Sequence, residues 1–484
     1  MPFKEYEQNQ LLLLPLSLKS FLPSEHPVHA INEIVEGFDL TQLYDKYSPL
    51  GSSAYHPQMM LKVLFYAYVM GERSSRLIAH KLKSDIAYLY LSALQQPDFR
   101  TINRFRQDNL PLIKDLFLQL VSLCTHMGMV SLGKIALDGT RLKANASYQK
   151  TKKLSALEEE LKLLEKEIEV ILRECEEIDS KEDSMLGEAN NPYELKEELR
   201  GKERLKEKLL QAKEKLTSHN MKEINLTDND CATMLHKGYQ PEPSYNGLVA
   251  VEEKSGLIVS ATLTNNASDY EALRILVEEA ETNTNLKPDL LLADSGFTSF
   301  ANLQYLKDKG IVGFLPDQMR VSIRKGTCSN PKFHKSKFVY EETLDTYLCP
   351  LNKVLNFKRL LKRPGKPAVK LYRGRDCPAC PKKKECTSNR YRTIQQDPRE
   401  YLAREVADRL ATQEGQALYN KRKCMVEPVF GDLKHNRRFK SFSLRGGLKA
   451  LGEFLLLCIA HNLRKIYKYL LQEKPTFKLQ LIST

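Results

Sequence analysis

Three acidic residues, distant along the chain, have local contexts that suit metal-dependent chemistry. Asp138 ends the short strand pattern KIALD, Asp294 ends the apolar run LLLAD, and Glu427 lies in the helical pattern CMVEPVFGD. Ligands gather at strand ends in open α/β sheets, and carboxylate oxygens are donors that Mg²⁺ prefers. Two aspartates on neighbouring strands and a glutamate on a helix can therefore converge on one pair of Mg²⁺ ions.

Such a site would act on a phosphodiester. Two ions roughly 3.5–4 Å apart can activate an attacking oxygen and stabilise the leaving oxygen. Taken singly, each acid has a simpler explanation: a turn at Asp138, a helix cap at Asp294 and surface charge at Glu427. Only the joint pattern of the three acids favours a metal site.

A second group of residues that suits a metal is formed by four cysteines. The segment CPACPKKKEC has the spacing C-x₂-C-x₅-C, and the earlier segment LCP supplies a fourth thiol. Four thiolates with a close pair suit a structural Zn²⁺ site, whereas free or redox-sensitive thiols are the alternative. Cys328 and His334 are weaker substitute ligands. The four residues are Cys349, Cys377, Cys380 and Cys386.

Other acids near the predicted core have structural explanations. Asp228 and Asp230 in TDNDC suit a turn, and Asp269 follows Ser268 at the predicted start of a helix. We therefore assign none of these three aspartates to a metal.

The N-terminal part of the chain is predicted to be helical. Within residues 26–127, apolar patterns predict helices over 56–71, 74–85 and 97–110, the last with Thr101 as N-cap. Three short helices at this spacing fit a helix-turn-helix-like domain, and a plain helical bundle with exposed arginines is the alternative. The start of the last helix is where recognition helices contact DNA. The arginines placed there are Arg100, Arg104 and Arg106.

The middle of the chain alternates strand and helix patterns, which indicates an α/β core with a mixed sheet. Predicted strands cover 133–147, 244–253, 256–266, 287–299 and 311–316, and predicted helices cover 268–283, 300–310, 400–436 and 446–472.

Two segments interrupt this core. Residues 151–218 have a heptad seam that begins at Leu154 and Leu157 and resumes after the turn residues GEANNPYE, so they predict an antiparallel helical hairpin. Residues 317–395 are basic, rich in Pro and Lys, poor in periodicity, and contain the four cysteines.

The charge of the chain is unevenly distributed. The net charge is +13, and residues 301–400 hold 23 Lys and Arg against 9 Asp and Glu, while 401–484 hold 16 against 7. A basic module on an otherwise acidic protein suggests a polyanionic partner, most simply nucleic acid, although a solvated basic surface gives the same counts. No segment reaches the ~20 apolar residues of a membrane helix, and we see no signal peptide, so we expect a cytoplasmic protein.

The segments that carry the three acids resemble the catalytic blocks of DDE transposases of bacterial insertion sequences. These segments are LDGTRLKANAS, LLADSGF and YNKRKCMVEPVFGDLKHNRRFKSF, and the resemblance extends to PDFRTINRFR in the helical part. The last block resembles the family's Tyr-Arg-Glu-Lys signature at Tyr419, Arg422, Glu427 and Lys434. The resemblance implies an RNase H-like fold, an Asp-Asp-Glu triad, dependence on Mg²⁺ and mobilisation of the element that encodes the protein.

The signature departs from the family pattern at one point. The family commonly has three residues between Arg and Glu, whereas four separate Arg422 from Glu427. On a helix, Arg422 lies about 140° from Glu427, while Lys423 lies only about 40° away, so Lys423 is a candidate for the arginine's role. Pro428 predicts that the helix bends or begins anew there. The residues of this block expected to bind DNA near the cut are Tyr419, Arg422, Lys423, Lys434, Arg437 and Arg438.

Together these observations predict an α/β protein with an RNase H-like mixed-sheet catalytic core, a helical N-terminal domain, an inserted helical hairpin and a Cys-containing insertion. The expected units are 1–127 (helical, DNA-binding), 128–316 with 396–484 (catalytic core), 151–218 (hairpin) and 317–395 (zinc-binding).

The expected function is that of a DNA transposase that cuts at the terminal inverted repeats of an insertion sequence and joins the freed 3′ ends to target DNA. We expect two Mg²⁺ ions, a structural Zn²⁺, double-stranded DNA as partner, a homodimer or higher assembly on DNA, and association with the bacterial nucleoid. The alternatives are an enzyme that cuts without transferring strands, an inactive copy, and a zinc-dependent DNA-binding regulator without chemistry.

Overall fold

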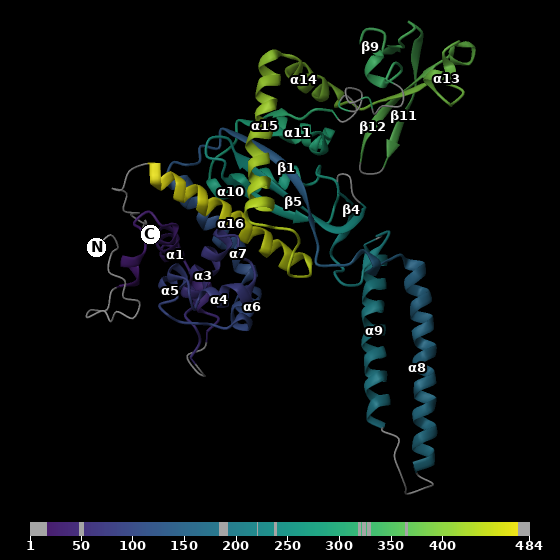
Figure 1. Cartoon of the computed structure of the whole chain (residues 1–484). Helices are drawn as coiled ribbons and strands as arrows, with labels where there is room; N and C mark the ends of the chain where they lie inside the picture. Colours follow the sequence, from purple (N-terminus) through teal and green to yellow (C-terminus); the bar gives the residue numbers. More distant parts are fainter. Residues whose placement is uncertain are drawn as a thin grey trace, which may run out of the picture.

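The structure is a computed structural model that describes residues 17–47, 53–182, 192–219, 221–236, 240–317, 321, 326, 331–363 and 366–472. Its centre is a mixed sheet in the order β4-β5-β1-β7-β8, with β6 also paired to β5 (Figure 1). The strands are β1 (Lys134–Lys143), β4 (Ala232–Leu235), β5 (Pro241–Glu252), β6 (Ile258–Thr264), β7 (Leu290–Ala293) and β8 (Val312–Phe314).

The directions of the strands define the class of the sheet. β1 and β6 run antiparallel to β5, while β7 is parallel to both β1 and β8. Three antiparallel strands continued by two parallel ones, with helices joining the parallel strands, form an RNase H-like core. The predicted fold class is thereby confirmed.

Helices from both segments of the core, 128–316 and 396–484, pack on this sheet. Helix α15 (Gln413–Gly431) contacts β1, and α16 (Gly447–Gln472) contacts β6 and also α3 and α7 of the N-terminal part (Figure 1). The other core helices are α10 (Ala272–Thr284), α11 (Phe300–Lys309) and α14 (Glu400–Ala411).

The N-terminal helices share one hydrophobic core with the sheet. Helix α3 is buried over nearly its whole surface, because its apolar residues face α16 as well as α1, and its buried side chains belong to the same cluster as those of β1. The helices of this part are α1 (Pro27–Glu36), α2 (Thr41–Tyr44), α3 (Pro57–Val69), α4 (Ser75–Lys81), α5 (Ile86–Leu91), α6 (Phe99–Asp108) and α7 (Leu110–His126).

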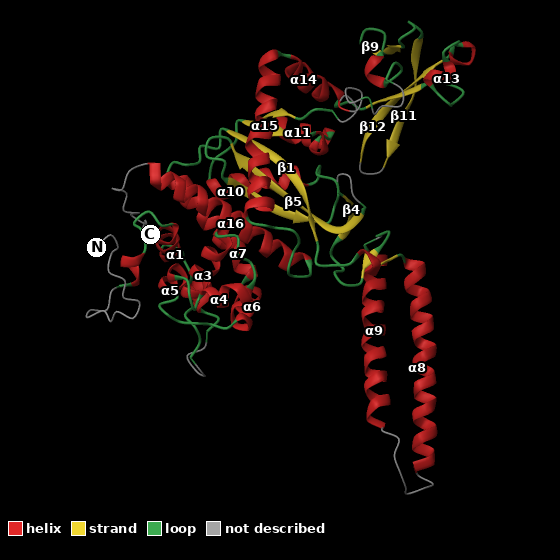
Figure 2. Ribbon diagram, in the orientation of Figure 1, coloured by secondary structure: helices red, strands yellow, loops and turns green. Residues whose placement is uncertain are grey.

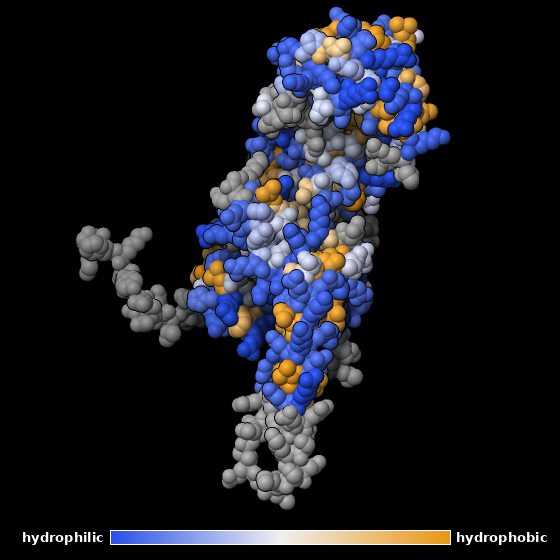
Figure 3. All heavy atoms as spheres, turned by 90° about the vertical axis from the view of Figure 1, so that its right-hand side faces the viewer, coloured by the Kyte–Doolittle hydropathy of each residue, from blue (hydrophilic) through white to orange (hydrophobic). Residues whose placement is uncertain are grey.

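The predicted hairpin projects from the core as two long helices, α8 (Leu154–Glu182) and α9 (Pro192–Ser218) (Figure 2). Leu157, Leu161 and Leu209 are buried between them in a small core of their own. At its base β2 (Thr151–Lys152) pairs with β3 (Ile224–Asn225). In the view of Figure 3, its outer surface is mostly hydrophilic with scattered apolar side chains.

The base of the hairpin is tied to the core through an acidic residue. Asp230 forms an ion pair with Lys215 of α9 and accepts a hydrogen bond of 2.7 Å from the backbone N–H of Gly447 at the start of α16. The buried carboxylate of Asp228 accepts the hydroxyl hydrogen of Tyr245 at 2.8 Å. Both aspartates therefore have structural partners.

The Cys-containing insertion is more regular than its sequence predicts. Its strands form a separate antiparallel sheet in the order β13-β12-β11-β10-β9, around a small core that contains Tyr347, Leu355 and Tyr372. Sequence periodicity missed this sheet because much of it faces solvent on both sides. The strands are β9 (Val339–Glu341), β10 (Thr346–Leu348), β11 (Val354–Arg363), β12 (Lys366–Gly374) and β13 (Thr393–Gln396).

Several predicted boundaries are wrong. Asp138 lies in the middle of β1 rather than at its end, because β5 pairs with the whole length of this strand. Asp98 rather than Thr101 caps α6, since its carboxylate accepts the backbone N–H of Thr101 at 2.7 Å. Helix α10 begins at Ala272, after Glu271, and not at Ser268.

Helix α15 also continues through Pro428, where a bend or a new start was predicted. The Pro428 ring is exposed while Met425, Val426 and Val429 are buried, so packing holds the helix where a backbone hydrogen bond is lost. The irregularity comes later, as a π-helical turn over Asp432–Asn436.

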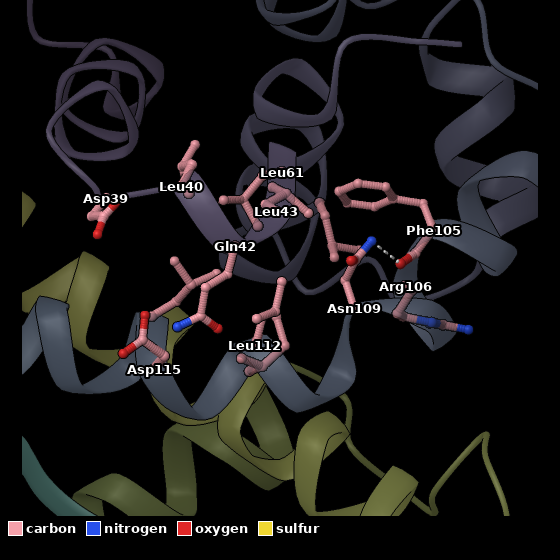
Figure 4. Close-up of a pocket in the computed structure, with 13 residues that line it drawn as sticks. Asp39, Leu40, Gln42, Leu43, Leu61, Phe105, Arg106, Asn109, Leu112 and Asp115 are labelled. Atoms are coloured by element: carbon pink, nitrogen blue, oxygen red, sulfur yellow. Dashed lines mark hydrogen bonds between the residues drawn. The ribbon is translucent and has the colours of Figure 1, made fainter. Parts of the chain in front are cut away.

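A small pocket within the N-terminal helices is too small to hold a substrate. It has a volume of about 20 Å³ and lies beside Leu43, Leu61 and Leu112 (Figure 4). At one side the Asn109 side chain donates a hydrogen bond of 2.9 Å to the backbone carbonyl of Phe105, which closes the end of α6. A space of this size has room for about one water molecule.

Candidate active site

The register of the sheet places two of the predicted acids side by side. In the parallel pair of β1 and β7, Leu137 lies opposite Ala293, so the next residues, Asp138 and Asp294, follow paired positions on neighbouring strands. Neighbouring strands are about 4.8 Å apart. Asp294 also accepts the backbone N–H of Gly296 at 2.8 Å, which fixes its carboxylate at the end of β7.

Glu427 reaches the same place from α15. This helix packs on β1, and Glu427 lines a cavity of about 1530 Å³ together with Asp138 and Asp294. Among the described cavities this one contains all three acids. The structure therefore brings together residues that are almost 290 positions apart in the sequence.

Arg422 contacts one of these acids directly. Its Nη1 lies 3.0 Å from Oδ2 of Asp138, and the Arg422 side chain is only 12% exposed. Lys423 also lines the cavity but is exposed. The helical angle alone favoured Lys423, whereas the geometry favours Arg422, because its long side chain spans the angle that separates it from Glu427.

The electrostatic state of Asp138 reflects this environment. Burial raises its pKa to about 6; Arg422 opposes this rise, and the nearby charge of Asp294 adds to it. Arg422 itself is held in its charged form, since the charges of Asp138 and Asp294 raise its pKa despite its burial. A divalent cation at this place would relieve the repulsion between the two aspartates.

A fourth acid, which the sequence interpretation left out, lies in the same cavity. Asp269 precedes α10, and its Oδ1 accepts a hydrogen bond of 2.5 Å from the buried side-chain amide of Asn246 on β5. A Cβ on Gly296 would lie 2.8 Å from Oδ2 of Asp269 and 2.9 Å from Oδ1 of Asp294. A Cβ on Gly139 would lie 3.2 Å from Oδ1 of Asp269.

Two glycines thus leave room for Asp269 beside both predicted catalytic aspartates. Burial raises the pKa of Asp269, and the charge of Asp294 adds to the rise while Asn246 opposes it. The segment NASDYEAL reads as a helix start, so only the strand order, which is a tertiary property, could have indicated this position.

The donor chemistry at this cavity suits Mg²⁺. Carboxylates from β1, β7 and α15 are hard oxygen donors, and the cavity is open enough for a large substrate. As the side chains stand, no group of three or more His, Cys, Asp or Glu residues is arranged around a metal position anywhere in the described part of the chain. Arg422 instead occupies one oxygen of Asp138.

The residues predicted to bind DNA fall into two groups. Arg100, Arg104, Lys423 and Arg438 are exposed, and Tyr419 and Lys434 line the cavity. The Nζ of Lys434 also donates to the backbone carbonyl of Arg141 at 3.3 Å.

Arg106 and Arg437 are buried, so their predicted contact with DNA is corrected. Arg437 is 1% exposed and bonds to Asp432 and to the backbone carbonyls of Tyr68 and Ala460. Arg106 is 5% exposed and donates to the carbonyl of Arg73 at 2.9 Å. Both arginines lie in basic, polar segments, so the sequence does not indicate that each guanidinium group donates hydrogen bonds to backbone carbonyls inside the protein.

The four predicted zinc ligands come together beside the sheet of the insertion. Cys349 lies in the turn between β10 and β11, where its Sγ accepts backbone N–H groups of Leu351 and Lys353 at 3.4 and 3.3 Å. The Sγ of Cys377 accepts the N–H of Arg392 at 3.4 Å. Burial raises the pKa of Cys386, and the other three thiols raise it further.

This donor set fits zinc by its chemistry, although the thiols do not surround a metal position as they stand. His334 bonds to Ser336 and caps a short 3₁₀ turn instead. Cys328 lies outside the described residues.

Comparison with known families agrees with this geometry. Residues 348–467 match a transposase DDE domain family, and residues 16–108 match a second transposase domain family. The first match contains Glu427 and the four cysteines, and the second contains Arg100 and Arg104. Both matched families are transposase families, which agrees with the resemblance of the three acidic segments to DDE transposases of insertion sequences.

No curated protein matches the chain significantly. Within the described residues, no helix combines the length and the apolar character needed to cross a membrane.

Proposed function

We propose that this protein is a DNA transposase that cleaves DNA at the terminal inverted repeats of an insertion sequence and joins the freed 3′ ends to target DNA. The observation that carries the proposal is the convergence of Asp138, Asp294 and Glu427 on one cavity, in a chain whose segment around Glu427 matches a transposase DDE domain. The large open cavity suits a polymer better than a small metabolite.

In this proposal the three acids hold two Mg²⁺ ions. The bound ions would activate the attacking oxygen and stabilise the leaving oxygen of the phosphodiester. Asp138 and Asp294 contribute oxygens fixed by the sheet, and Glu427 contributes one from a helix that packs on it. Arg422, released from Asp138, would be placed to bind a phosphate of the substrate.

The remaining cations around the cavity would hold the DNA backbone. Lys423 and Arg438 are exposed, while Tyr419 and Lys434 line the cavity wall. The pairing of two element ends requires at least two active sites, so we propose a dimer or a larger assembly on DNA. The place of action would be the bacterial nucleoid.

We also propose that Cys349, Cys377, Cys380 and Cys386 hold a structural Zn²⁺ ion in the unit 317–395. The N–H groups directed at two of the thiols support this, because such bonds favour the thiolate that a metal requires. Metal analysis of freshly purified protein should find about one equivalent of zinc, and Cys377→Ser with Cys380→Ser should lose it. Less than about half an equivalent in the unaltered protein would contradict this part of the proposal.

The transposase proposal is tested with labelled DNA that carries the ends of the element, incubated with the purified protein and Mg²⁺. We expect strand cleavage at the ends and joining to a second duplex. Asp138→Asn should bind the same DNA with unchanged affinity and leave every strand whole. Cleavage that survives this substitution would refute the assignment of Asp138, and a wild-type protein that binds without cutting would indicate a regulator.

A further inference from the structure

A broad groove lies between α4 and α6, away from the cavity with the acids. It has a volume of about 1000 Å³, and its wall is completed by Ser443 and Leu444 from the segment that precedes α16. The N-terminal helices and the RNase H-like core therefore form this groove together. Within the described part of the protein, the side chains along it are mostly arginines and neutral polar groups.

The arginines of this groove form two layers. In the inner layer Arg73 donates to Glu453 at 3.0 Å and to the backbone carbonyl of Ser441 at 3.1 Å, while Arg106 donates to the carbonyl of Arg73. These bonds fix the α4–α6 wall to the core. Because both guanidinium groups already donate to groups of the protein, we assign the inner layer a structural role.

The outer layer is exposed. The guanidinium carbons of Arg76 and Arg100 lie 5.2 and 5.7 Å from the centre of the Phe99 ring, one from each helix, and Arg104 lies one turn further along α6. Within the described residues none of these three arginines forms a salt bridge. The carboxylate of nearby Asp98 is engaged by the backbone of α6.

The segment between the π-helical turn and α16 joins this groove to the acidic cavity. Ser441 forms a β-bridge with Lys143 at the end of β1, and Arg445 donates to the backbone carbonyl of Asn145 at 3.1 Å. Asn145 in turn donates to the carbonyl of Ser443 at 2.8 Å. The exposed cations of this segment are Arg438, Lys440 and Arg445.

We propose that the α4–α6 groove binds a DNA double helix through its phosphates, and that the same duplex continues across Arg438, Lys440 and Arg445 into the cavity with Asp138. This inference rests on the proposed function and adds the path of the DNA to it. Lys143 lies five residue steps after Asp138 along β1, a distance of about 17 Å, which equals about five base pairs at 3.4 Å each. Lys143 pairs with Ser441, close to the groove residues Ser443 and Leu444, so we expect the groove to contact DNA about five base pairs from the phosphodiester that lies at the three acids.

The binding test uses a 30-base-pair duplex of arbitrary sequence without Mg²⁺, because phosphate contacts do not depend on sequence. The triple variant Arg76→Gln, Arg100→Gln, Arg104→Gln should bind it about tenfold or more weakly at 0.1 M salt, and the slope of log K against log salt should fall by about 2.7. The matched control Lys162→Gln, Lys166→Gln, Arg204→Gln changes three exposed cations on the hairpin and should leave both quantities unchanged.

The path is tested by hydrogen exchange of the wild-type complex. Addition of duplex should protect residues 75–81, 99–108 and 438–446 together, and leave α8 and α9 unchanged. An unchanged salt slope in a folded triple variant, protection that omits α4 and α6, or competition by an acidic polypeptide in preference to DNA would each overturn the inference. Neither experiment measures cleavage. A protein that binds DNA in the groove but does not cut it would therefore disprove the proposed chemistry and leave the proposed DNA path supported.

Discussion

The register between β1 and β7 determines which side chains lie beside Asp138. Parallel pairing places Asp294 beside it, and burial against α15 brings Arg422 into contact. Its pKa of about 6 means that the carboxyl group holds a proton below that pH, so protons and a metal ion compete for it.

Metal binding should therefore weaken as the pH falls through 6. The affinity for Mn²⁺, measured by electron paramagnetic resonance on the DNA-free protein, should drop by up to about tenfold per pH unit between pH 6 and pH 5. Asp138→Asn should bind Mn²⁺ weakly and without this dependence. A flat profile across this range in the unaltered protein would show that Asp138 is not a ligand.

Asp269 should matter through its position beside the two aspartates. Asp269→Asn keeps the size and the bond to Asn246 possible but removes the charge, so we expect cleavage to fall by about 10–100-fold and Mn²⁺ affinity to fall with it. Duplex binding should stay unchanged. Asp289→Asn, an exposed aspartate just before β7, is the matched control and should alter neither quantity.

At the scale of elements, the π-helical turn after α15 connects three parts of the fold. Asp432 binds Arg437, Arg464 and His461, while Arg437 also reaches carbonyls of α3 and α16. Although burial alone would raise it, His461 and Arg437 hold the pKa of Asp432 well below its usual range. A depressed pKa stabilises the fold above the ordinary value of 3.8, and this stabilisation is lost as the pH falls below it.

Arg437→Met should consequently lower the free energy of unfolding at pH 7 by about 3–5 kcal/mol, since it leaves Asp432 buried beside an incomplete set of partners. Denaturant unfolding measures this loss, which should shrink below pH 4. Arg438→Met, at the exposed neighbouring position, should leave stability unchanged. Equal effects of the two substitutions would contradict the distinction between a structural and a surface arginine.

The sequence predicted the elements of the core better than it predicted their ends. The apolar run before Asp294 and the pattern around β8 correspond to strands in the structure, because buried parallel strands have a distinctive composition. Asp269, the Asp138–Arg422 contact and the burial of Arg437 were beyond sequence reasoning. Each depends on which elements become neighbours, and local pattern carries little information about that.

At the scale of the whole molecule, the hairpin stands apart from the rest. Helices α8 and α9 bury Leu157, Leu161 and Leu209 against each other, and Glu158 meets Lys213 across the pair at 3.0 Å. The heptad pattern predicted this hairpin because its contacts are local. The joint between the N-terminal helices and the sheet, which depends on long-range packing, was not predicted.

Replacement of residues 159–212 by a short Gly-Ser turn should accordingly leave the rest of the protein folded. We expect a single unfolding transition with a Tm within a few degrees of the full-length value, because the removed side chains pack on each other. Circular dichroism should lose helical signal in proportion to the residues removed. A Tm lower by more than about 10 °C would show that the hairpin supports the core.

Within the residues that the structure describes, the shared hydrophobic core of α3, α16 and the central sheet leaves no hinge between the α4–α6 groove and the cavity with the acids. The length of one strand, β1, then sets the offset between the first contacted phosphates and the scissile bond. Lengthening of the segment that joins the π-helical turn to α16 would change how DNA is held without changing that offset. A protein built in this way would cut at a constant spacing from the phosphates held in the groove.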